Sequence, residues 1–169
     1  MKKLLTALVV IVSMATAGSV CAQDFNKGLR AAQSGDFATA LKEWTVLAEQ
    51  GDAAALHNLG LMYGKGQGVV QDYKEAAKWY RKSAEQGLAA AQFALGAMYA
   101  NGDGVIQDNV YAHMWFNIAA SNGDKNAVKY RDMAAKNMMA ADISKAQGLA
   151  RACVAKKYKG CWGRWPEWS

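Results

Sequence analysis

Proline, histidine and cysteine are scarce in this chain. Its 169 residues include 1 Pro, 2 His and 3 Cys. The proline, Pro166, lies beyond every helix that the sequence predicts, so it interrupts none of them. The histidines, His57 and His113, lack the spacing of metal ligands, and we therefore predict no metal site.

The motifs of common hydrolases and nucleotide-binding proteins are also missing. No serine lies in a nucleophile-elbow pattern, and the carboxylates fall mostly at expected helix ends. The glycine-rich stretch 64–69 lacks both the preceding strand of a dinucleotide site and the Gly-Lys-Ser/Thr end of a P-loop. We therefore predict no catalytic residues and no cofactor, and we interpret both histidines as partly exposed residues on helix surfaces.

The N-terminal apolar run is too short to span a bilayer. Two lysines precede apolar residues over 4–12, whereas a transmembrane helix needs about 20 apolar residues. Small residues then end the segment at Ala22, which is the layout of a secretory signal peptide. We expect residues 1–22 to be removed and the mature protein to be exported, periplasmic or secreted. A lipoprotein signal ending at Cys21 is less favoured, because the preceding Val20 is bulky.

Charge is unevenly distributed along the chain. Residues 23–124 carry 8 Lys and Arg against 11 Asp and Glu, a net charge of −3, whereas residues 125–169 carry 10 against 3, a net charge of +7. The tail, residues 156–169, interleaves cations with aromatic side chains. We predict that it either contacts an anionic membrane or cell-wall surface or folds back over the end of the protein. Nucleic acid is not an expected partner for an exported protein. The candidate tail surface residues are Lys156, Lys157, Lys159, Arg164 and Trp165.

The dominant feature of the sequence is an internal repeat. Residues 53–88 recur as residues 89–124, at a shift of 36 positions. A period of this length is typical of solenoids and helical arrays. The matched pairs include Leu59 and Leu95, Gly60 and Gly96, Tyr63 and Tyr99, Trp79 and Trp115, and Gly87 and Gly123.

Each repeat is predicted to form a helix, a glycine-rich turn and a second helix. Asp72 is the expected N-cap of the second helix, and Glu75 three residues later predicts a capping box, in which the glutamate side chain reaches back. Asp36 and Asp108 hold equivalent positions. Glycine in the middle of a helix costs about 1 kcal/mol relative to alanine, so the recurrence of Gly60 predicts close packing against a neighbouring backbone.

The repeated pattern resembles a known family. It reads Leu-Gly-x-x-Tyr-x-x-Gly-x-Gly-Val-x-x-Asp, followed by Ala-x-x-Trp-Tyr and Ala-Glu-Gln-Gly. Over residues 53–124 it is similar to the Sel1-like repeat, a relative of the tetratricopeptide repeat. The resemblance implies an all-α fold, a short right-handed α-solenoid with a C-terminal capping helix. It also implies a non-enzymatic adaptor of the bacterial cell envelope that binds a protein or peptide.

In related repeats the first helix of each pair lines the concave side of the solenoid. The candidate binding residues are therefore the positions of those helices outside the core, namely His57, Asn58, Leu61, Phe93, Ala94 and Ala97. Two other functions remain open: a weak hydrolase acting on β-lactam or cell-wall substrates, and binding of an anionic lipid or glycan surface through the tail. Relatives linked to β-lactams carry cysteine pairs within their repeats, and this chain has none there.

Atypical units are predicted on both sides of the two full repeats, so that the solenoid covers residues 23–155. Residues 25–50 form a shortened first unit, which suits an N-terminal cap. Helices are expected over residues 125–138 and 141–155 as the C-terminal cap. Its methionines, Met133, Met138 and Met139, are expected to fill the core.

The cysteine count predicts one disulfide. Removal of Cys21 with the signal peptide leaves Cys153 and Cys161 as an even pair in an oxidising compartment. A bridge closing this short loop stabilises the fold by roughly 2.5 kcal/mol on the loop-entropy model. Two free thiols, or a bridge between two molecules, are the alternatives.

Overall fold

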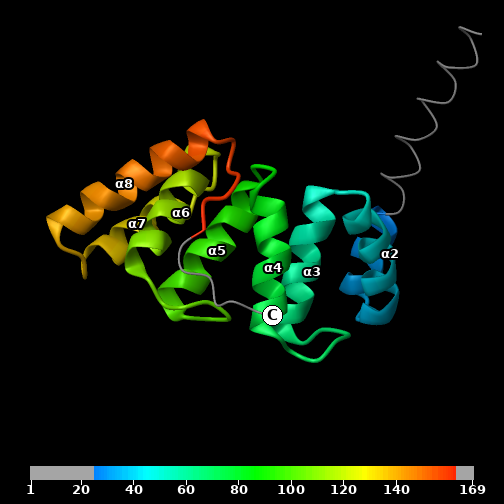
Figure 1. Cartoon of the computed structure of the whole chain (residues 1–169). Helices are drawn as coiled ribbons and strands as arrows, with labels where there is room; N and C mark the ends of the chain where they lie inside the picture. The colour runs from blue at the N-terminus through cyan, green and yellow to red at the C-terminus, as the bar shows by residue number, and fades with distance from the viewer. Residues whose placement is uncertain (1–24, 163–169) are drawn as a thin grey trace, which may run out of the picture.

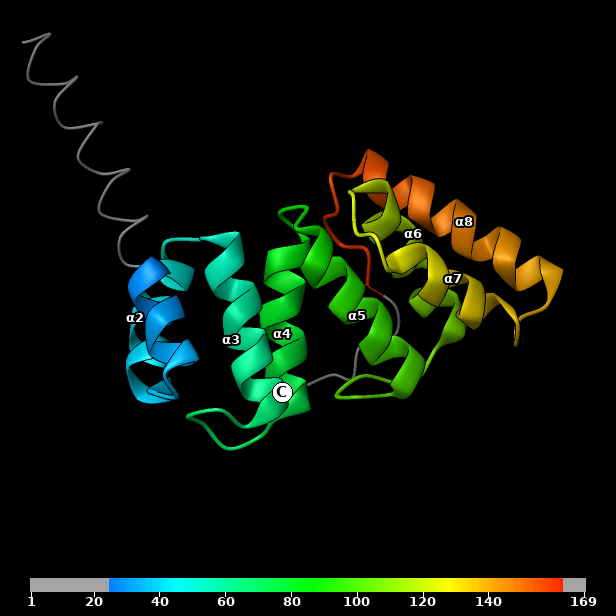
Figure 2. The same ribbon diagram turned by 180° about the vertical axis from the view of Figure 1, so that it is seen from behind.

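The computed structural model describes residues 25–162, and all regular secondary structure within that range is helical. The helices follow one another from α2 at one end of the molecule to α8 at the other, which confirms the predicted α-solenoid (Figures 1 and 2). The predicted signal peptide and the tail residues Arg164 and Trp165 lie outside the described residues. After helical residues 25–33 come α2 Phe37–Glu49, α3 Ala53–Lys65, α4 Tyr73–Ala84, α5 Ala89–Asn101, α6 Asn109–Ser121, α7 Ala127–Ala135 and α8 Ala140–Ala155.

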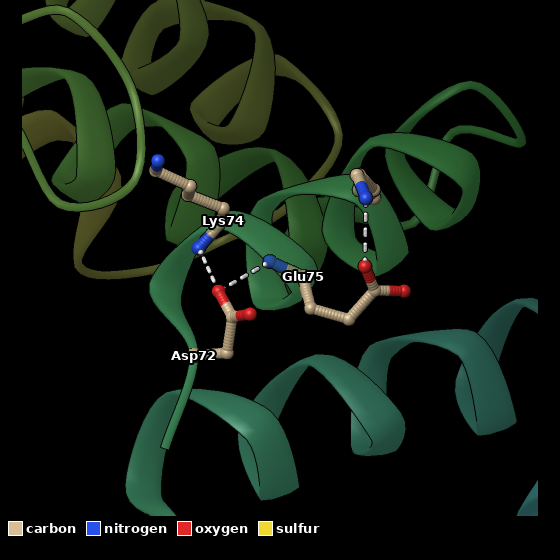
Figure 3. Close-up of polar contacts among 4 residues, drawn as sticks. Asp72, Lys74 and Glu75 are labelled. Atoms are coloured by element: carbon tan, nitrogen blue, oxygen red, sulfur yellow. Dashed lines mark hydrogen bonds and ion pairs between the residues drawn. The ribbon is translucent and has the colours of Figure 1, made fainter. Parts of the chain in front are cut away.

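Aspartates cap the helices as predicted, but the capping box is incomplete. The Asp72 carboxylate accepts hydrogen bonds from the backbone N–H groups of Lys74, at 2.8 Å, and Glu75, at 3.0 Å (Figure 3). Asp108 caps α6 in the same way. The Glu75 side chain pairs with Lys78 Nζ, at 2.8 Å, instead of reaching back to the cap. A lysine one turn later offers the carboxylate an opposite charge, and this contact replaces the predicted back-bond.

The glycine-rich stretch serves to end a helix and turn the chain. Gly66 and Gly102, which follow α3 and α5, have φ angles of 67° and 80°. Residues with a Cβ atom rarely adopt this left-handed conformation, so glycine at both positions fixes where the helices stop. The side chains of Gln71 and Gln107 each donate a 2.8 Å hydrogen bond to a carbonyl in the last turn of the preceding helix.

The mid-helix glycines do permit close packing, although the neighbour is a side chain. A Cβ atom added to Gly60 would lie 2.7 Å from the Tyr80 ring, and one added to Gly96 would lie 2.6 Å from the Phe116 ring. The prediction of a neighbouring backbone was therefore wrong. Tyr80 and Phe116 are equivalent residues of the two repeats, so the same aromatic contact is used twice.

The buried core is organised around large aromatic residues. Trp44 of α2 packs with Leu59 of α3 in one cluster, and Trp115 of α6 lies in a larger cluster that includes residues of α4, α5, α6 and α8. Trp115 is fully buried, whereas its repeat equivalent Trp79 is only half-buried. The two tryptophans therefore have different environments despite their matching positions.

The C-terminal unit departs from the regular helix pair. Helices α7 and α8 both pack against α6, whereas α3 and α4, like α5 and α6, pack mainly on each other. Met133 is 49% exposed and Met139 is 72% exposed, so the prediction that these methionines fill the core was wrong. Met133 lies on the open side of α7, and Met139 immediately precedes α8, where no further repeat covers it within the described residues.

Candidate interaction surface

A hollow opens between the two full repeats. Its volume is about 210 Å³, and its walls come from α3, α4 and α5. The lining is largely apolar, with Lys65 and Asp103 as its charged members. Six of its lining residues are Leu61, Tyr73, Tyr80, Ala94, Ala97 and Met98.

A second hollow, of about 340 Å³, opens between α5, α6 and α7. Its polar members are amides, among them Asn101 and Asn137. Ala97 lines both hollows, so the two adjoin across α5. Six of the residues that line this second hollow are Ala97, Asn109, Phe116, Tyr130, Met133 and Ala134.

The two hollows occupy the same position in successive units. Each of the six residues named for the first hollow lies 36 positions before its counterpart in the second. Tyr80 corresponds to Phe116, and Ala94 corresponds to Tyr130. The repeat therefore generates one surface, which we call the groove, from a single arrangement of helices used twice.

Three of the six predicted concave residues line the groove: Leu61, Ala94 and Ala97. The ring of His57 instead packs on Tyr80, with centroids 5.3 Å apart. The ring of Phe93 lies against those of Phe116 and Tyr130, at 5.4 and 5.1 Å. Asn58 is half-buried and lines neither hollow.

The sequence reasoning missed the contribution of α7 to the groove. Tyr130 and Met133 line the second hollow, and both are partly exposed. The side chains of this unit no longer match the repeat pattern, but the 36-residue register continues and places them opposite α5. Register alone could therefore have identified them as equivalents of Ala94 and Ala97.

The histidines do not form an accessible catalytic pair. His113 is 3% exposed, which contradicts the prediction of a partly exposed surface residue. Arg131 and Asp132 of α7, a helix that packs on α6, act on His113 electrostatically. Burial is the main cause that lowers its pKa, and the positive charge of Arg131 lowers it further. Burial also lowers the pKa of His57, which is half-buried. Burial leaves the His113 ring almost no surface in contact with solvent.

Residues 156–162, the C-terminal strap, turn back from the end of α8 toward the middle of the solenoid (Figure 2). Cys153 of α8 and Cys161 of the strap form a disulfide, with Cα atoms 5.4 Å apart, as the sequence predicts. The Trp162 ring stacks on that of Trp115, with centroids 5.3 Å apart. The predicted folding back of the tail therefore holds for its described part.

Polar contacts fix the strap to the repeats. The Tyr158 hydroxyl donates to Asn122 Oδ1 at 3.1 Å, and Asn122 Nδ2 donates to Gln92 Oε1 at 2.8 Å. Gln92 is fully buried and donates in turn to the carbonyl of Ala84. This chain of bonds connects the strap to α6, α5 and α4, while Lys156, Lys157 and Lys159 remain exposed.

Among residues 25–162, no helix combines the length and the apolar character that crossing a bilayer requires. Nor does that range bring three or more His, Cys, Asp or Glu side chains together in a way that could hold a metal ion.

Comparison with known proteins identifies the fold family. The Sel1 repeat matches residues 53–88 and 89–124, the two full repeats. A Sel1 repeat protein from Oxalobacter formigenes is 30% identical, with a TM-score of 0.62, and the alignment covers 75% of this chain and 98% of that one. The chain belongs to the Sel1-repeat family.

A second similar structure is a larger Sel1-repeat protein. It is c5321, described as a protective antigen of uropathogenic Escherichia coli strains with an SLR fold, and it is 32% identical with a TM-score of 0.77. The alignment covers 85% of this chain but 32% of c5321, so this Sel1-repeat chain spans about a third of that antigen. A search of curated proteins gives no match.

Proposed function

We propose that this Sel1-repeat protein is a non-enzymatic adaptor of the bacterial cell envelope that binds a protein or peptide along the groove. The observation that carries the proposal is the pair of equivalent hollows that adjoin at Ala97. Solenoids present extended surfaces of this kind for binding, and Sel1-repeat folds commonly serve protein interaction.

The composition of the groove suits a polypeptide ligand. Tyr73 and Tyr130 supply exposed aromatic surface, and the small residues Ala94 and Ala97 leave room in the same hollows. Apolar side chains of a partner gain affinity by leaving water for such hollows. The amides at the second hollow, including Asn137, supply donors and acceptors for a partner backbone.

An envelope location is part of the proposal. A disulfide such as that between Cys153 and Cys161 persists in oxidising compartments, which include the periplasm. The signal-peptide pattern of residues 1–22 supports the same location. Cell fractionation tests it: the mature chain should appear with periplasmic or secreted proteins, and accumulation of the uncleaved chain in the cytoplasm would contradict export.

The binding test begins with affinity capture from envelope extracts, after which the affinity of the captured partner is measured by calorimetry. Leu61→Glu and Ala97→Glu place a charge in the groove and should abolish binding. Because both residues also pack against the core, circular dichroism and melting measurements check that each variant still folds at the assay temperature. Ala38→Glu introduces the same charge at an exposed position of α2 and is the matched control. Binding that survives both groove substitutions would move the site elsewhere.

A further inference from the structure

The strap brings two basic segments of the sequence together. Lys159 Nζ lies 3.8 Å from Glu85 Oε2, just beyond the end of α4, and the guanidinium of Arg81 lies 4.6 Å from the centre of the Trp162 ring. These contacts hold residues 156–162 against α4, although the two segments are separated by more than one repeat in the sequence.

The combined surface is strongly positive. Residues 75–85 and 156–162 carry six cations and two carboxylates, Glu75 and Glu85, so the net charge of the two segments is +4. Glu75 pairs with Lys78, and Glu85 lies within 4 Å of both Arg81 and Lys159, so neither carboxylate is far from a cation. We call the exposed surface of these two segments the basic face. Its cations are Lys78, Arg81 and Lys82 of α4 and Lys156, Lys157 and Lys159 of the strap.

Two tryptophans flank the cations of α4. Lys82 Nζ lies 4.5 Å from the centre of the Trp79 ring, and the Arg81 guanidinium lies over the Trp162 ring. Both indole rings are half-buried, so each retains some exposed aromatic surface. Tryptophan favours the boundary between water and lipid, and lysine is attracted to anionic headgroups.

The basic face and the groove lie on different sides of α4. Ala76 and Tyr80 line the groove, whereas Lys78 and Lys82 follow each of them by two positions. Residues two apart on an α-helix point about 200° from each other around its axis. A surface bound to the basic face would therefore leave the groove open to a partner.

We propose that the basic face docks this protein onto an anionic phospholipid bilayer. The proposal is independent of what binds in the groove. It differs from binding by the tail sequence alone, because half of the cations belong to α4 and all of them lie within the described residues. The tryptophan pair favours a bilayer over a soluble anionic polymer, which offers no interface between water and lipid.

The test is co-sedimentation of the protein with phosphatidylcholine vesicles, with and without phosphatidylglycerol. Wild type should pellet with the anionic vesicles only, and added salt should weaken the binding. Each lysine near an anionic membrane surface strengthens binding about fivefold, so the double variant Lys78→Gln and Lys82→Gln should bind the anionic vesicles roughly 30-fold more weakly.

Controls separate this face from the total charge and from the tail. Lys42→Gln combined with Lys136→Gln removes the same charge from exposed positions on α2 and after α7, and should bind as wild type does. The lysine variants change exposed positions, and the folding of every variant is checked by circular dichroism. The proposal fails if the control double variant loses as much binding as the α4 variant. It also fails if Arg164→Gln with Trp165→Ala abolishes binding while the α4 variant retains it, or if the protein binds a soluble anionic glycan but no vesicle.

Discussion

Substitution of Gly96 by alanine should destabilise the protein relative to the same substitution at an unconstrained helix position, although alanine is the better helix former. The added Cβ atom would lie 2.6 Å from the nearest atom of the Phe116 ring, closer than such contacts occur in folded proteins. Either the ring or the helix must therefore move. Gly148 in α8 offers the matched control, because the atom nearest to its added Cβ is Arg151 Nη2, 4.0 Å away at the end of a flexible side chain.

The expected magnitude follows from two opposing terms. Replacing glycine by alanine within a helix contributes about 1 kcal/mol of stability at either position. Forcing an extra group into a packed contact costs about 1–3 kcal/mol, and only position 96 incurs this cost. The difference between the two variants in the free energy of unfolding should therefore be about 1–3 kcal/mol, or roughly 2–12 °C in melting temperature.

Thermal and urea unfolding of the two variants and wild type measure this difference. Gly148→Ala should melt above wild type, and Gly96→Ala should melt well below Gly148→Ala. In the background of Phe116→Leu, a smaller side chain faces position 96, so the cost of Gly96→Ala should shrink. If both alanine variants gain the same stability, the close contact with the ring is not a constraint and the packing account is wrong.

Asp72→Ala should lower the free energy of unfolding by about 1 kcal/mol, because it removes the cap of α4. Glu75→Ala should lower it by less than half as much, since the Glu75 side chain pairs with Lys78 and not with the cap. Equal losses in thermal melts would mean that a full capping box exists. Burial lowers the pKa of His113 below its ordinary 6.5, so below that pH the unfolded chain takes up a proton that the folded chain does not. Stability should therefore fall with acidification in melts from about pH 7 to pH 5, and more steeply in wild type than in His113→Asn; parallel curves would contradict this. Intact mass under non-reducing conditions should show a monomer two hydrogens lighter than the reduced form, whereas labelling of Cys153 and Cys161 without prior reduction would exclude their bridge.

The sequence predicted features that depend on local chemistry or exact repetition. The aspartate caps, the glycine turns and the repeat boundaries all follow from short patterns, and each recurs at 36 positions. The pairing of Cys153 with Cys161 was predicted by counting, because removal of Cys21 with the expected signal peptide leaves these two cysteines as an even pair. These inferences need no knowledge of how one helix pair packs on the next.

Features that depend on packing between units were predicted less well. The mid-helix glycines indicated a close neighbour, but only the crossing of adjacent helices determines that this neighbour is an aromatic ring. His113 of α6 is buried, and α7 packs on that helix in an arrangement that the sequence of α6 does not encode. Likewise, Met133 is as apolar as a core residue, and its exposure follows from the absence of a regular pair between α7 and α8.

The candidate site was predicted in part for the same reason. Leu61 and Ala97 were found because the first helix of each pair was known to line the concave side, and both positions repeat. Tyr130 was missed because its unit retains the register but not the residue types. The strap lysines of the basic face were predicted as a tail surface, but its α4 cations were missed, since the sequence separates α4 from the strap that the disulfide and Trp162 bring against it.

Site-specific photo-crosslinking in cells that produce the protein tests the groove most directly. A photoreactive amino acid is placed at position 97, where the two hollows adjoin, and in a separate strain at position 38, on the exposed surface of α2. A binding groove predicts a discrete crosslinked protein from position 97, lost when Leu61→Glu is added, and none from position 38. Irradiation that yields no adduct at position 97, while a reporter at position 82 on the opposite side of α4 captures a discrete protein, would contradict the assignment of the groove as the binding surface.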